Sequence, residues 1–392
     1  MRHARFPRSV VLLAFTSLFA DISTEMLYPV LPLFLTKELA APVSVVGIVE
    51  GIAEGTQNLV QGISGTLADR LRRNKPLALL GYSLAALAKP AIGLAVAWPQ
   101  VLAGRFVDRL GTGIRSAPRD ALIANAIDEP RRGAAFGLEG FGDNLGAVLG
   151  PLLTAGLLYL LHVDMRAVFF VAFLPGIVAF ALVTTVRESP PAARTPEDRI
   201  TLRELPGGYW RYLLAVGAFG IGNSSKAFII LKATAIGIAP EQTLLVYAGY
   251  NLVAALASYP AGGLSDRWGR KRLLLAALVV FVVTYTGLAI AASAWLVATL
   301  FVLYGVHQGA FRAVGKALAV DLVPRPLRAS GVGLYGATVG LSALLASVVG
   351  GQLWDRLGPA ATFAYGAACA LLGAAVLVAA VPSRMDDRRH ER

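Results

Sequence analysis

The sequence predicts an all-α membrane protein of twelve transmembrane helices, arranged as two six-helix halves with pseudo-two-fold symmetry. Of its 392 residues, 56% are hydrophobic and only 15% are charged, and the mean hydropathy is +0.63. In a soluble protein of this length, about a quarter of all residues would be charged. Long apolar stretches recur along the chain, and the second half repeats patterns of the first. These observations exclude an ordinary soluble domain.

Twelve stretches have about the 20 apolar residues that a membrane span requires, and charged or Gly/Pro turns separate them. The first follows the basic segment Met1–Arg8 and could imitate a secretion signal. Because it continues to Leu35 and other spans follow, we expect an uncleaved first helix. The twelve stretches are residues 9–35, 43–67, 77–97, 101–126, 133–161, 167–186, 209–235, 243–264, 272–292, 295–320, 329–353 and 360–382.

A polar segment separates the sixth stretch from the seventh. From Arg187 to Pro206 it carries charges of both signs and four prolines, which is typical of a linker. We therefore expect an N-terminal six-helix bundle at 1–186, a cytoplasmic linker at 187–208, and a C-terminal six-helix bundle with a short cytoplasmic tail at 209–392.

The distribution of lysine and arginine predicts the orientation, because positively charged loops stay in the cytoplasm. The side that holds both termini and the linker carries 24 of them, and the opposite side carries only Lys37, Arg166 and Arg356. We expect a monomer in the lipid bilayer of a plasma membrane, the inner membrane of a bacterium, with both termini cytoplasmic. We attribute the net charge of +12 to the lysines and arginines on the cytoplasmic side of the membrane. We therefore do not interpret it as a sign of nucleic-acid binding, and we expect no nucleic-acid partner.

The two halves repeat each other. The loop GTLADRLRRNK (Gly65–Lys75) has a counterpart in GGLSDRWGRKR (Gly262–Arg272). At an offset of 196 residues, Ala121, Pro130 and Gly137 align with Ala317, Pro326 and Gly333. Such internal similarity predicts two half-chains of six spans each.

The repeated G-x-x-x-D-R loop, the six plus six spans and the cytoplasmic linker resemble the major facilitator superfamily. The second copy matches the signature closely, whereas the first reads LRRN at 71–74, where a glycine is usual. Glycine permits close helix approach, and an acid beside basic residues can cap a helix end. The resemblance implies a conformational latch made of Gly65, Asp69, Arg70, Gly262, Asp266, Arg267 and Arg270.

A narrower resemblance points to the drug-proton antiporters of that family. Gly146, Gly150 and Pro151 match the first part of the antiporter motif G-x-x-x-G-P-x-x-G-G, and Thr154 and Ala155 replace its final glycines. Arg166 to Phe169 resembles the W-R-x-x-F that follows. The fourth span resembles the pattern L-x-x-x-R-x-x-Q-G-x-G through three residues and departs from it at two others: Arg105, Leu110 and Gly111, and Asp108 and Arg109. This resemblance implies efflux and a role in drug resistance.

Charges within the spans are divided unequally between the halves. The N-terminal half holds eight acids and five cations, which gives −3, whereas the C-terminal half holds four cations and no acid, which gives +4. This fold places its substrate between the halves, so the asymmetry predicts a cavity with one acidic and one basic wall. The residues are Asp21, Glu25, Glu50, Glu54, Asp108, Asp120, Glu139, Asp143, Lys89, Arg105, Arg109, Arg115 and Arg119, and then Lys226, Lys232, Arg312 and Lys316.

Three pairs of acids are spaced four residues apart, so each pair shares a helix face. Two acids one turn apart repel, which enables one of them to take up a proton. We expect a proton-coupling site with Asp21 and Glu54 as the first choices; the alternative is a static salt-bridge network joining four spans. The candidate proton-coupling residues are Asp21, Glu25, Glu50, Glu54, Glu139 and Asp143, with Arg105 or Arg115 as the competing counter-charge.

Polar residues in the C-terminal half mark a candidate substrate-binding site. Lys226 and Arg312 require an anion, which is an acid across the cavity, a substrate carboxylate or phosphate, or a lipid headgroup. His307 and the tyrosines are alternatively packing residues. The candidate substrate-binding residues are Asn223, Lys226, Tyr250, Asn251, His307 and Arg312.

The leading hypothesis is a secondary active transporter that exports a small molecule by alternating access, coupled to protons. The alternatives are an organic-anion transporter, including uptake, that uses Lys226 and Arg312, a divalent metal cation exporter, and a non-transporting receptor or lipid-handling protein. The sequence contains no metal motif, nucleophile elbow or phosphate-binding loop, so we expect neither enzymatic activity nor a cofactor or resident metal. A single cysteine, Cys369, excludes an internal disulfide.

Overall fold

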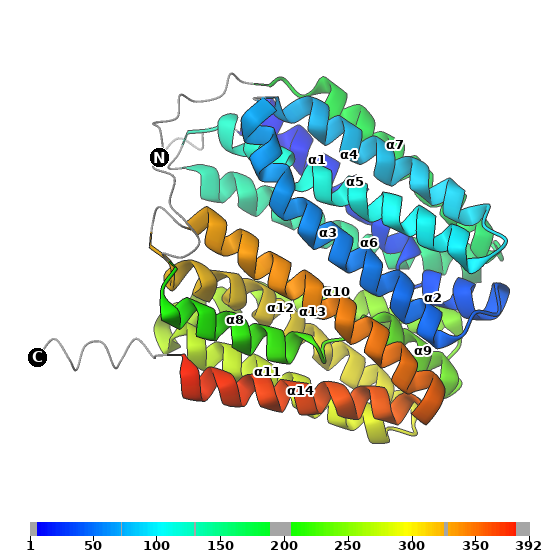
Figure 1. Cartoon of the computed structure of the whole chain (residues 1–392). Helices are drawn as coiled ribbons and strands as arrows, with labels where there is room; N and C mark the ends of the chain where they lie inside the picture. The colour runs from blue at the N-terminus through cyan, green and yellow to red at the C-terminus, as the bar shows by residue number, and fades with distance from the viewer. Residues whose placement is uncertain (1–5, 72, 129–130, 189–204, 325–327, 382–392) are drawn as a thin grey trace, which may run out of the picture. The chain divides into compact units, whose positions relative to one another are not determined.

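The computed structural model describes residues 6–71, 73–128, 131–188, 205–324 and 328–381, with the side chains of all but 65–71, 133 and 328–330. All regular structure in these ranges is helical (Figure 1). The elements are α1 (Arg8–Leu27), α2 (Leu31–Leu33), the π-helical turn η1 (Phe34–Glu38), α3 (Val43–Leu71), α4 (Asn74–Gly93), α5 (Trp98–Asn125), α6 (Arg132–Tyr159), α7 (Met165–Thr185), α8 (Gly207–Gly220), α9 (Ala227–Ala235), α10 (Pro240–Trp268), α11 (Arg270–Ile290), α12 (Ala294–Asp321), α13 (Arg328–Leu357) and α14 (Pro359–Ala380).

Each of the twelve predicted stretches is helical, but the first and the seventh are interrupted. The first consists of α1, α2 and η1, with Pro32 in the first turn of α2. The seventh consists of α8 and α9, which are separated by residues 221–226. Proline lacks a backbone donor and glycine stabilises helix poorly, so Pro29 and Gly222 account for these breaks locally.

Nine helices in the described part of the chain are long and apolar enough, by length and composition, to cross a membrane. The remaining predicted spans are α3, α5 and the divided α8 and α9. Charged and polar residues lower the hydropathy of α3 and α5, and α8 and α9 are short, with 14 and 9 residues. The predicted spans that are too polar or too short to be recognised by length and composition therefore include α3 and α5, which carry charges of the interior.

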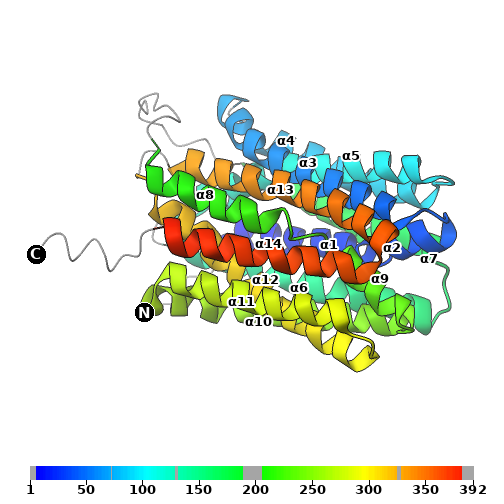
Figure 2. The same ribbon diagram turned by 60° about the horizontal axis from the view of Figure 1, so that its bottom comes forward.

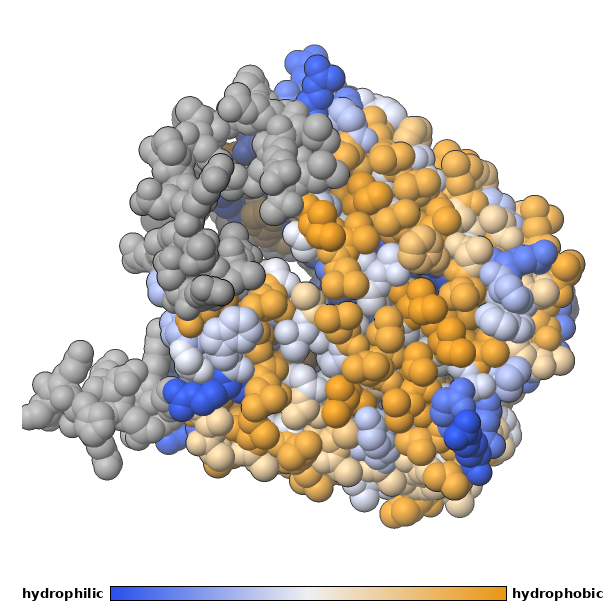
Figure 3. Space-filling view, in the orientation of Figure 1, coloured by the Kyte–Doolittle hydropathy of each residue, from blue (hydrophilic) through white to orange (hydrophobic). Residues whose placement is uncertain are grey.

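The outer surface of these helices is apolar. On the face drawn in Figure 3, hydrophobic side chains predominate. Leu94, Leu256 and Ile290 are exposed by 69%, 65% and 78%. Exposure of this extent is unusual for a soluble monomer, and it is what a surface in contact with lipid requires.

The chain divides into two compact units. One comprises Met1–Ala41, Ile52–Arg194 and Pro240–Ala248, and the other comprises Pro42–Gly51, Thr195–Ala239 and Gly249–Arg392. This division follows the expected one with two exceptions: the first turns of α3 belong to the second unit, and the first turns of α10 belong to the first unit. The domain limits at 186 and 209 therefore stay a proposal.

Packing within the two units repeats. In the first unit α4 packs on α5 and α7, and α1 packs on α7; in the second, α11 packs on α12 and α14, and α8 packs on α14 (Figure 2). Each helix of the second set is the counterpart of the helix in the first set whose label is lower by seven. The packing therefore has the same pattern as the sequence repeat.

Two lysines at equivalent positions cap helix ends in the same way. Lys75 Nζ donates to the carbonyl oxygens of Thr184 at 2.7 Å and Val186 at 2.8 Å. Lys271, 196 residues later, donates to Val378 at 3.0 Å and to Val381 at 2.5 Å. The last carbonyls of a helix lack intrahelical donors, and a cation there is favourable. These two side chains therefore close the ends of α7 and α14.

Candidate functional site

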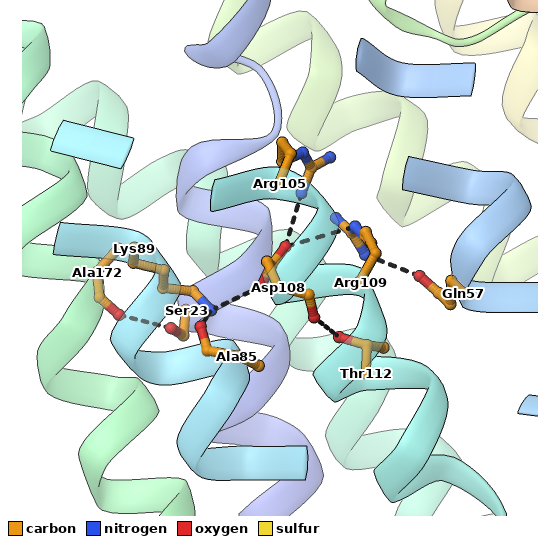
Figure 4. A network of polar contacts seen from close by, with 9 residues as sticks. All are labelled: Ser23, Gln57, Ala85, Lys89, Arg105, Asp108, Arg109, Thr112 and Ala172. Carbon is orange, nitrogen blue, oxygen red and sulfur yellow. Dashed lines mark hydrogen bonds and ion pairs between the residues drawn. The ribbon is translucent and has the colours of Figure 1, made fainter. Parts of the chain in front are cut away.

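The most densely charged part of the first unit surrounds Asp108 on α5 (Figure 4). Its carboxylate lies 2.8 Å from Arg105 Nη1, 3.3 Å from Lys89 Nζ and 3.5 Å from Arg109 Nε. Asp108, Arg105 and Lys89 are each exposed by 2% or less. We call these four residues the Asp108 cluster. It holds three cations and one anion, so two positive charges exceed its own carboxylate.

Further contacts connect the Asp108 cluster to neighbouring helices. Arg109 Nη1 donates to Gln57 Oε1 on α3 at 3.0 Å. Lys89 Nζ donates to the carbonyl oxygen of Ala85 at 2.8 Å, within α4. The Arg105 guanidinium lies 5.7 Å from the centre of the Tyr28 ring, beyond the end of α1. The cluster therefore joins α3, α4 and α5, and it is a structural site as well as a charged one.

Arg115, one of the expected counter-charges, lies near Lys89 but does not pair with Asp108. Its guanidinium stacks 4.4 Å from the centre of the Tyr82 ring. Within the described residues, Arg115 Nε and Nη1 and Tyr82 Oη have no hydrogen-bond partner. Arg115 acts electrostatically on Asp21 and Lys89. Arg115 is therefore a buried cation next to an acid that we expected to titrate.

The carboxyl groups of Asp21 on α1 and Asp143 on α6 lie close enough to share a hydrogen bond. Glu25 and Arg115 are the other charged groups that act on Asp21. Two carboxylates cannot form such a bond unless one carries a proton, because an ionised carboxylate only accepts. The structure therefore pairs acids of two helices, and not the two acids one turn apart on either helix.

Glycines of the antiporter motif make this pairing possible. A Cβ atom at Gly146 would lie 2.8 Å from the Asp21 Cβ, and one at Gly150 would lie 2.9 Å from the Glu25 Cβ. Pro151 lies inside α6. Thr154, where the motif has glycine, donates its hydroxyl to the Met26 carbonyl oxygen at 3.0 Å. The motif is therefore the surface on which α6 packs against the acidic face of α1.

Glu139 has a different role from Asp143, although the two share a face of α6. Its Oε1 lies 2.8 Å from Arg119 Nη1 and accepts a hydrogen bond from Ser17 Oγ at 2.7 Å. Arg119 Nη2 also lies 3.0 Å from Asp120 Oδ1. Glu139 therefore belongs to an ion-pair network with Arg119 and Asp120 of α5. This arrangement is the kind of static salt-bridge network that was the alternative to a proton-coupling site.

The remaining candidate acids lie on α1 and α3. Glu25 Oε2 accepts a hydrogen bond from Tyr247 Oη at 2.7 Å, within the first unit. Glu50 is 1% exposed, and within the second unit its Oε2 lies 3.5 Å from Ser225 Oγ. Glu54 is half-buried on α3. Of these acids, Glu25 is the one that acts on Asp21.

The second unit brings two of the candidate substrate residues together. Lys226 Nζ lies 5.3 Å from the centre of the Tyr250 ring, and Asn223 Oδ1 accepts a hydrogen bond from Tyr304 Oη at 3.0 Å. Asn251 is buried, with 9% exposure. Arg312 is exposed on α12. Lys226 and Asn223 both occupy the break between α8 and α9.

His307 is not positioned to bind a substrate in this conformation. It is fully buried, its Nδ1 lies 2.8 Å from the Ala277 carbonyl oxygen, and its ring contacts an aromatic cluster. These contacts favour the alternative packing role, and the assignment of His307 to the substrate site stays a prediction. The rings around it are Phe219, Phe281, Tyr304 and Phe311.

The second signature loop forms an ion-pair network between α10, α11 and α12. Arg270 Nη2 lies 2.6 Å from Asp266 Oδ1, and Arg270 Nε lies 3.3 Å from Asp321 Oδ2. Gly269 has φ +92°, which favours glycine at the α10–α11 turn. Gly262 is half-buried and Arg267 is exposed. The first copy, with Gly65, Asp69 and Arg70, lies outside the described side chains.

Sequence reasoning missed three residues of the first unit. Asp108 was noted only as a charge beside the arginines, although it is the carboxylate that holds the cluster together. Lys89 was counted but not assigned a role. A lone lysine in an apolar span requires an anion, and Asp108 is the acid nearest the middle of the next span, so this pair was predictable. Tyr82 gave no signal in the sequence.

Comparisons with known proteins agree with this architecture. The model of the Major Facilitator Superfamily matches residues 13–231 and 212–392. The chain is 31% identical over 378 residues to an uncharacterized MFS-type transporter of Methanocaldococcus jannaschii, which covers 95% of this chain and 94% of that one. It is 27% identical over 319 residues to the multidrug resistance protein MdtG of Citrobacter koseri, which covers 76% of each chain.

Among solved structures, the nucleoside transporter NupG has the same fold. Its TM-score is 0.81 at 12% identity, and the match covers 96% of this chain and 100% of that one. This confirms the predicted all-α membrane fold of twelve helices. Since the family model matches almost the whole chain and a relative above 30% identity covers 95% of it, the chain belongs to the major facilitator superfamily of membrane transporters.

Proposed function

We propose that this transporter exports a small molecule in exchange for protons, and that the Asp21–Asp143 pair carries the proton. The observation that supports this most directly is the close approach of the two carboxyl groups, within reach of a shared hydrogen bond. A proton held there at neutral pH is available for release when the surroundings of the pair change. Export is supported by the antiporter motif on α6 and by the similarity to a multidrug resistance protein.

Arg115 is the counter-charge in this proposal. When Asp21 and Asp143 share a proton, one negative charge faces Arg115. When the proton leaves, two negative charges face it, and the attraction draws the guanidinium towards the pair. Because a buried charge strongly favours a partner, proton loss would change the position of Arg115 on α5. Such a change links protonation to the rocking of the two halves that this fold uses for alternating access.

Replacing Asp143 by asparagine is expected to uncouple transport from the pH gradient. The amide can still donate a hydrogen bond to Asp21 but cannot release a proton. In everted vesicles offered ethidium, norfloxacin and salicylate, the wild-type protein should accumulate at least one probe when the interior is acidified. Asp143→Asn should reduce this accumulation to the level of vesicles without the protein, while exchange of preloaded probe continues.

The matched control is Asp164→Asn. Asp164 caps α7 by accepting a hydrogen bond from the Ala167 backbone N–H at 2.7 Å, and asparagine is an equally good N-cap residue, so this variant should leave both stability and coupling intact. If Asp143→Asn accumulates the probe with the same pH response as the wild-type protein, the pair does not carry the proton.

The proton on the pair can also be tested without a substrate. Infrared difference spectra of the purified protein at two pH values should contain the C=O stretch of a protonated carboxyl group. Both Asp21→Asn and Asp143→Asn should remove this band, whereas Asp164→Asn should retain it. A band that persists in both variants assigns the proton to another acid, and Glu25 is then the next residue to replace.

A second candidate function, transport of an organic anion, is favoured by the break between α8 and α9. Lys226 occupies the N-cap of α9, and the N-terminus of a half-helix attracts anionic substrates in transporters of interrupted helices. In the same vesicle assay, this alternative predicts that salicylate is accumulated and that Lys226→Met abolishes its binding. The proton-exchange proposal predicts instead that Asp143→Asn has the larger effect on accumulation.

A further inference from the structure

A small polar cavity lies inside the first unit, between α1, α4, α5 and α7. Its volume is about 10 Å³, which is room for about one water-sized species. Its polar lining consists of Ser23, Thr24, Tyr82, Lys89 and Arg115, and small apolar residues complete the wall. The cavity is therefore too small for a carboxylic acid or a phosphate, and it is not the transport pathway.

Two side chains of the lining present polar atoms without a partner in the described part of the chain. They are Arg115, through Nε and Nη1, and Tyr82, through its hydroxyl. Arg115 is 5% exposed and Tyr82 is 3% exposed. A buried polar group without a hydrogen bond destabilises the folded state, and a buried charged group does so more strongly. The geometry therefore favours a bound species that accepts several hydrogen bonds.

The lining consists mainly of donors. Arg115 and Lys89 offer only N–H groups and Tyr82 an unpaired O–H, while Ser23 already donates its hydroxyl to the Ala172 carbonyl oxygen at 2.5 Å. A water molecule could accept from the two Arg115 groups and donate to the Tyr82 hydroxyl, so hydrogen bonding alone does not distinguish water from an anion. An anion also compensates the positive charges of Arg115 and Lys89, which water does not.

The charges around the cavity lead to the same conclusion. Lys89 pairs with Asp108, but Arg105 and Arg109 use the same carboxylate. Arg115 forms no ion pair among the described residues. The acids that face this region from α1 and α6 are Asp21, Glu25 and Asp143, and in the proposed function Asp21 and Asp143 share one proton. Positive charge therefore remains in excess between Lys89 and Arg115.

We propose that this cavity binds one halide-sized monovalent anion, held by Arg115, Lys89 and the Tyr82 hydroxyl. Chloride is the abundant ion of this class. It is somewhat larger than water, and the long side chains of Lys89 and Arg115 can retreat to admit it. The bound anion would compensate the buried cations and stabilise the packing of α4 against α5 and α7. This proposal rests on the proposed function for the proton shared by Asp21 and Asp143, whereas its test measures anion binding and needs no transport.

The test measures the thermal unfolding midpoint of the purified protein while chloride replaces gluconate at constant pH and ionic strength. A ligand that binds only the folded state raises the midpoint. We expect a saturable increase of roughly a few degrees for the wild-type protein. Tyr82→Phe retains the ring under Arg115 but removes one donor, so it should shift the response to higher chloride concentrations. Ser83→Ala, on the same helix, should respond like the wild-type protein, because the Ser83 hydroxyl donates within α4 to Leu80.

Bromide provides the direct measurement. In crystals grown with bromide, its anomalous scattering should give a peak between residues 89 and 115 in the wild-type protein and a weaker one in Tyr82→Phe. Two outcomes overturn the proposal. Equal midpoints in chloride and gluconate, with Tyr82→Phe less stable than the wild-type protein, would assign the cavity to water. Equal midpoints with Tyr82→Phe more stable would show that the hydroxyl is simply unsatisfied.

Discussion

Asp108→Asn is expected to lower the free energy of unfolding by about 3 to 5 kcal/mol, which is the cost of removing one partner from a buried ion pair. Asp108 is 1% exposed and faces three cations. Asparagine has nearly the same shape but no charge, so Arg105, Lys89 and Arg109 would then repel one another without compensation. The thermal midpoint of the purified protein, followed by size-exclusion chromatography after heating, should fall accordingly.

Asp321→Asn is the matched control for this substitution. Asp321 pairs with Arg270 at 3.3 Å near the surface, and exposed pairs contribute about 0 to 1 kcal/mol. A second variant separates charge from shape: adding Lys89→Met to Asp108→Asn removes one of the repelling cations, and part of the lost stability should return. If Asp108→Asn costs no more than Asp321→Asn, the Asp108 cluster does not stabilise the fold.

Much of this architecture was predictable, because membrane spans obey simple rules. Length and hydropathy located the twelve helical stretches, and the 196-residue repeat was later matched by helix packing and by the paired lysines Lys75 and Lys271. The breaks in the first and seventh spans were harder to predict. Their sequences remain apolar on average, and only Pro29, Pro32 and the Gly222–Ser225 segment indicate that the backbone changes direction.

The partners of the charged side chains were less predictable. Helical periodicity places Arg105, Arg109, Arg115 and Arg119 on one side of α5, yet they have three different surroundings. Arg105 and Arg109 share Asp108, Arg115 stacks on Tyr82, and Arg119 pairs with Glu139. Periodicity gives the face of a helix but not the rotation and depth of its neighbours, and these decide which acid each arginine meets.

The same limitation applies to the acids. The spacing of four residues correctly placed Glu139 and Asp143 on one face of α6, and we expected each pair to act as a unit. Asp143 instead meets Asp21 across the α1–α6 contact, and Glu139 meets Arg119. Repulsion between two acids on one helix is weak compared with what either gains from a partner on another helix. An interhelical partner can be recognised only when the packing of the two helices is known.

The packing that brings Asp21 to Asp143 depends on glycine, so Gly146→Ala and Gly140→Ala should have effects of opposite sign. Both glycines lie on α6. A Cβ at Gly140 meets no atom within 4 Å, whereas one at Gly146 would lie 2.5 Å from the Leu18 carbonyl oxygen. Alanine favours helix by up to about 1 kcal/mol over glycine, so Gly140→Ala should stabilise slightly. Gly146→Ala should destabilise by about 1 to 3 kcal/mol, the usual cost of overpacking.

Gly146→Ala should also weaken the proton site, because α6 must move away from α1 to accommodate the methyl group. Any such movement lengthens the Asp21–Asp143 contact. The carboxyl C=O band in the infrared spectrum should therefore shift or weaken in Gly146→Ala and stay unchanged in Gly140→Ala, with accumulation in vesicles following the band. If Gly146→Ala loses stability but retains both the band and the pH response, the glycine serves helix packing alone. The antiporter motif would then contribute to the fold of this protein and not to its coupling.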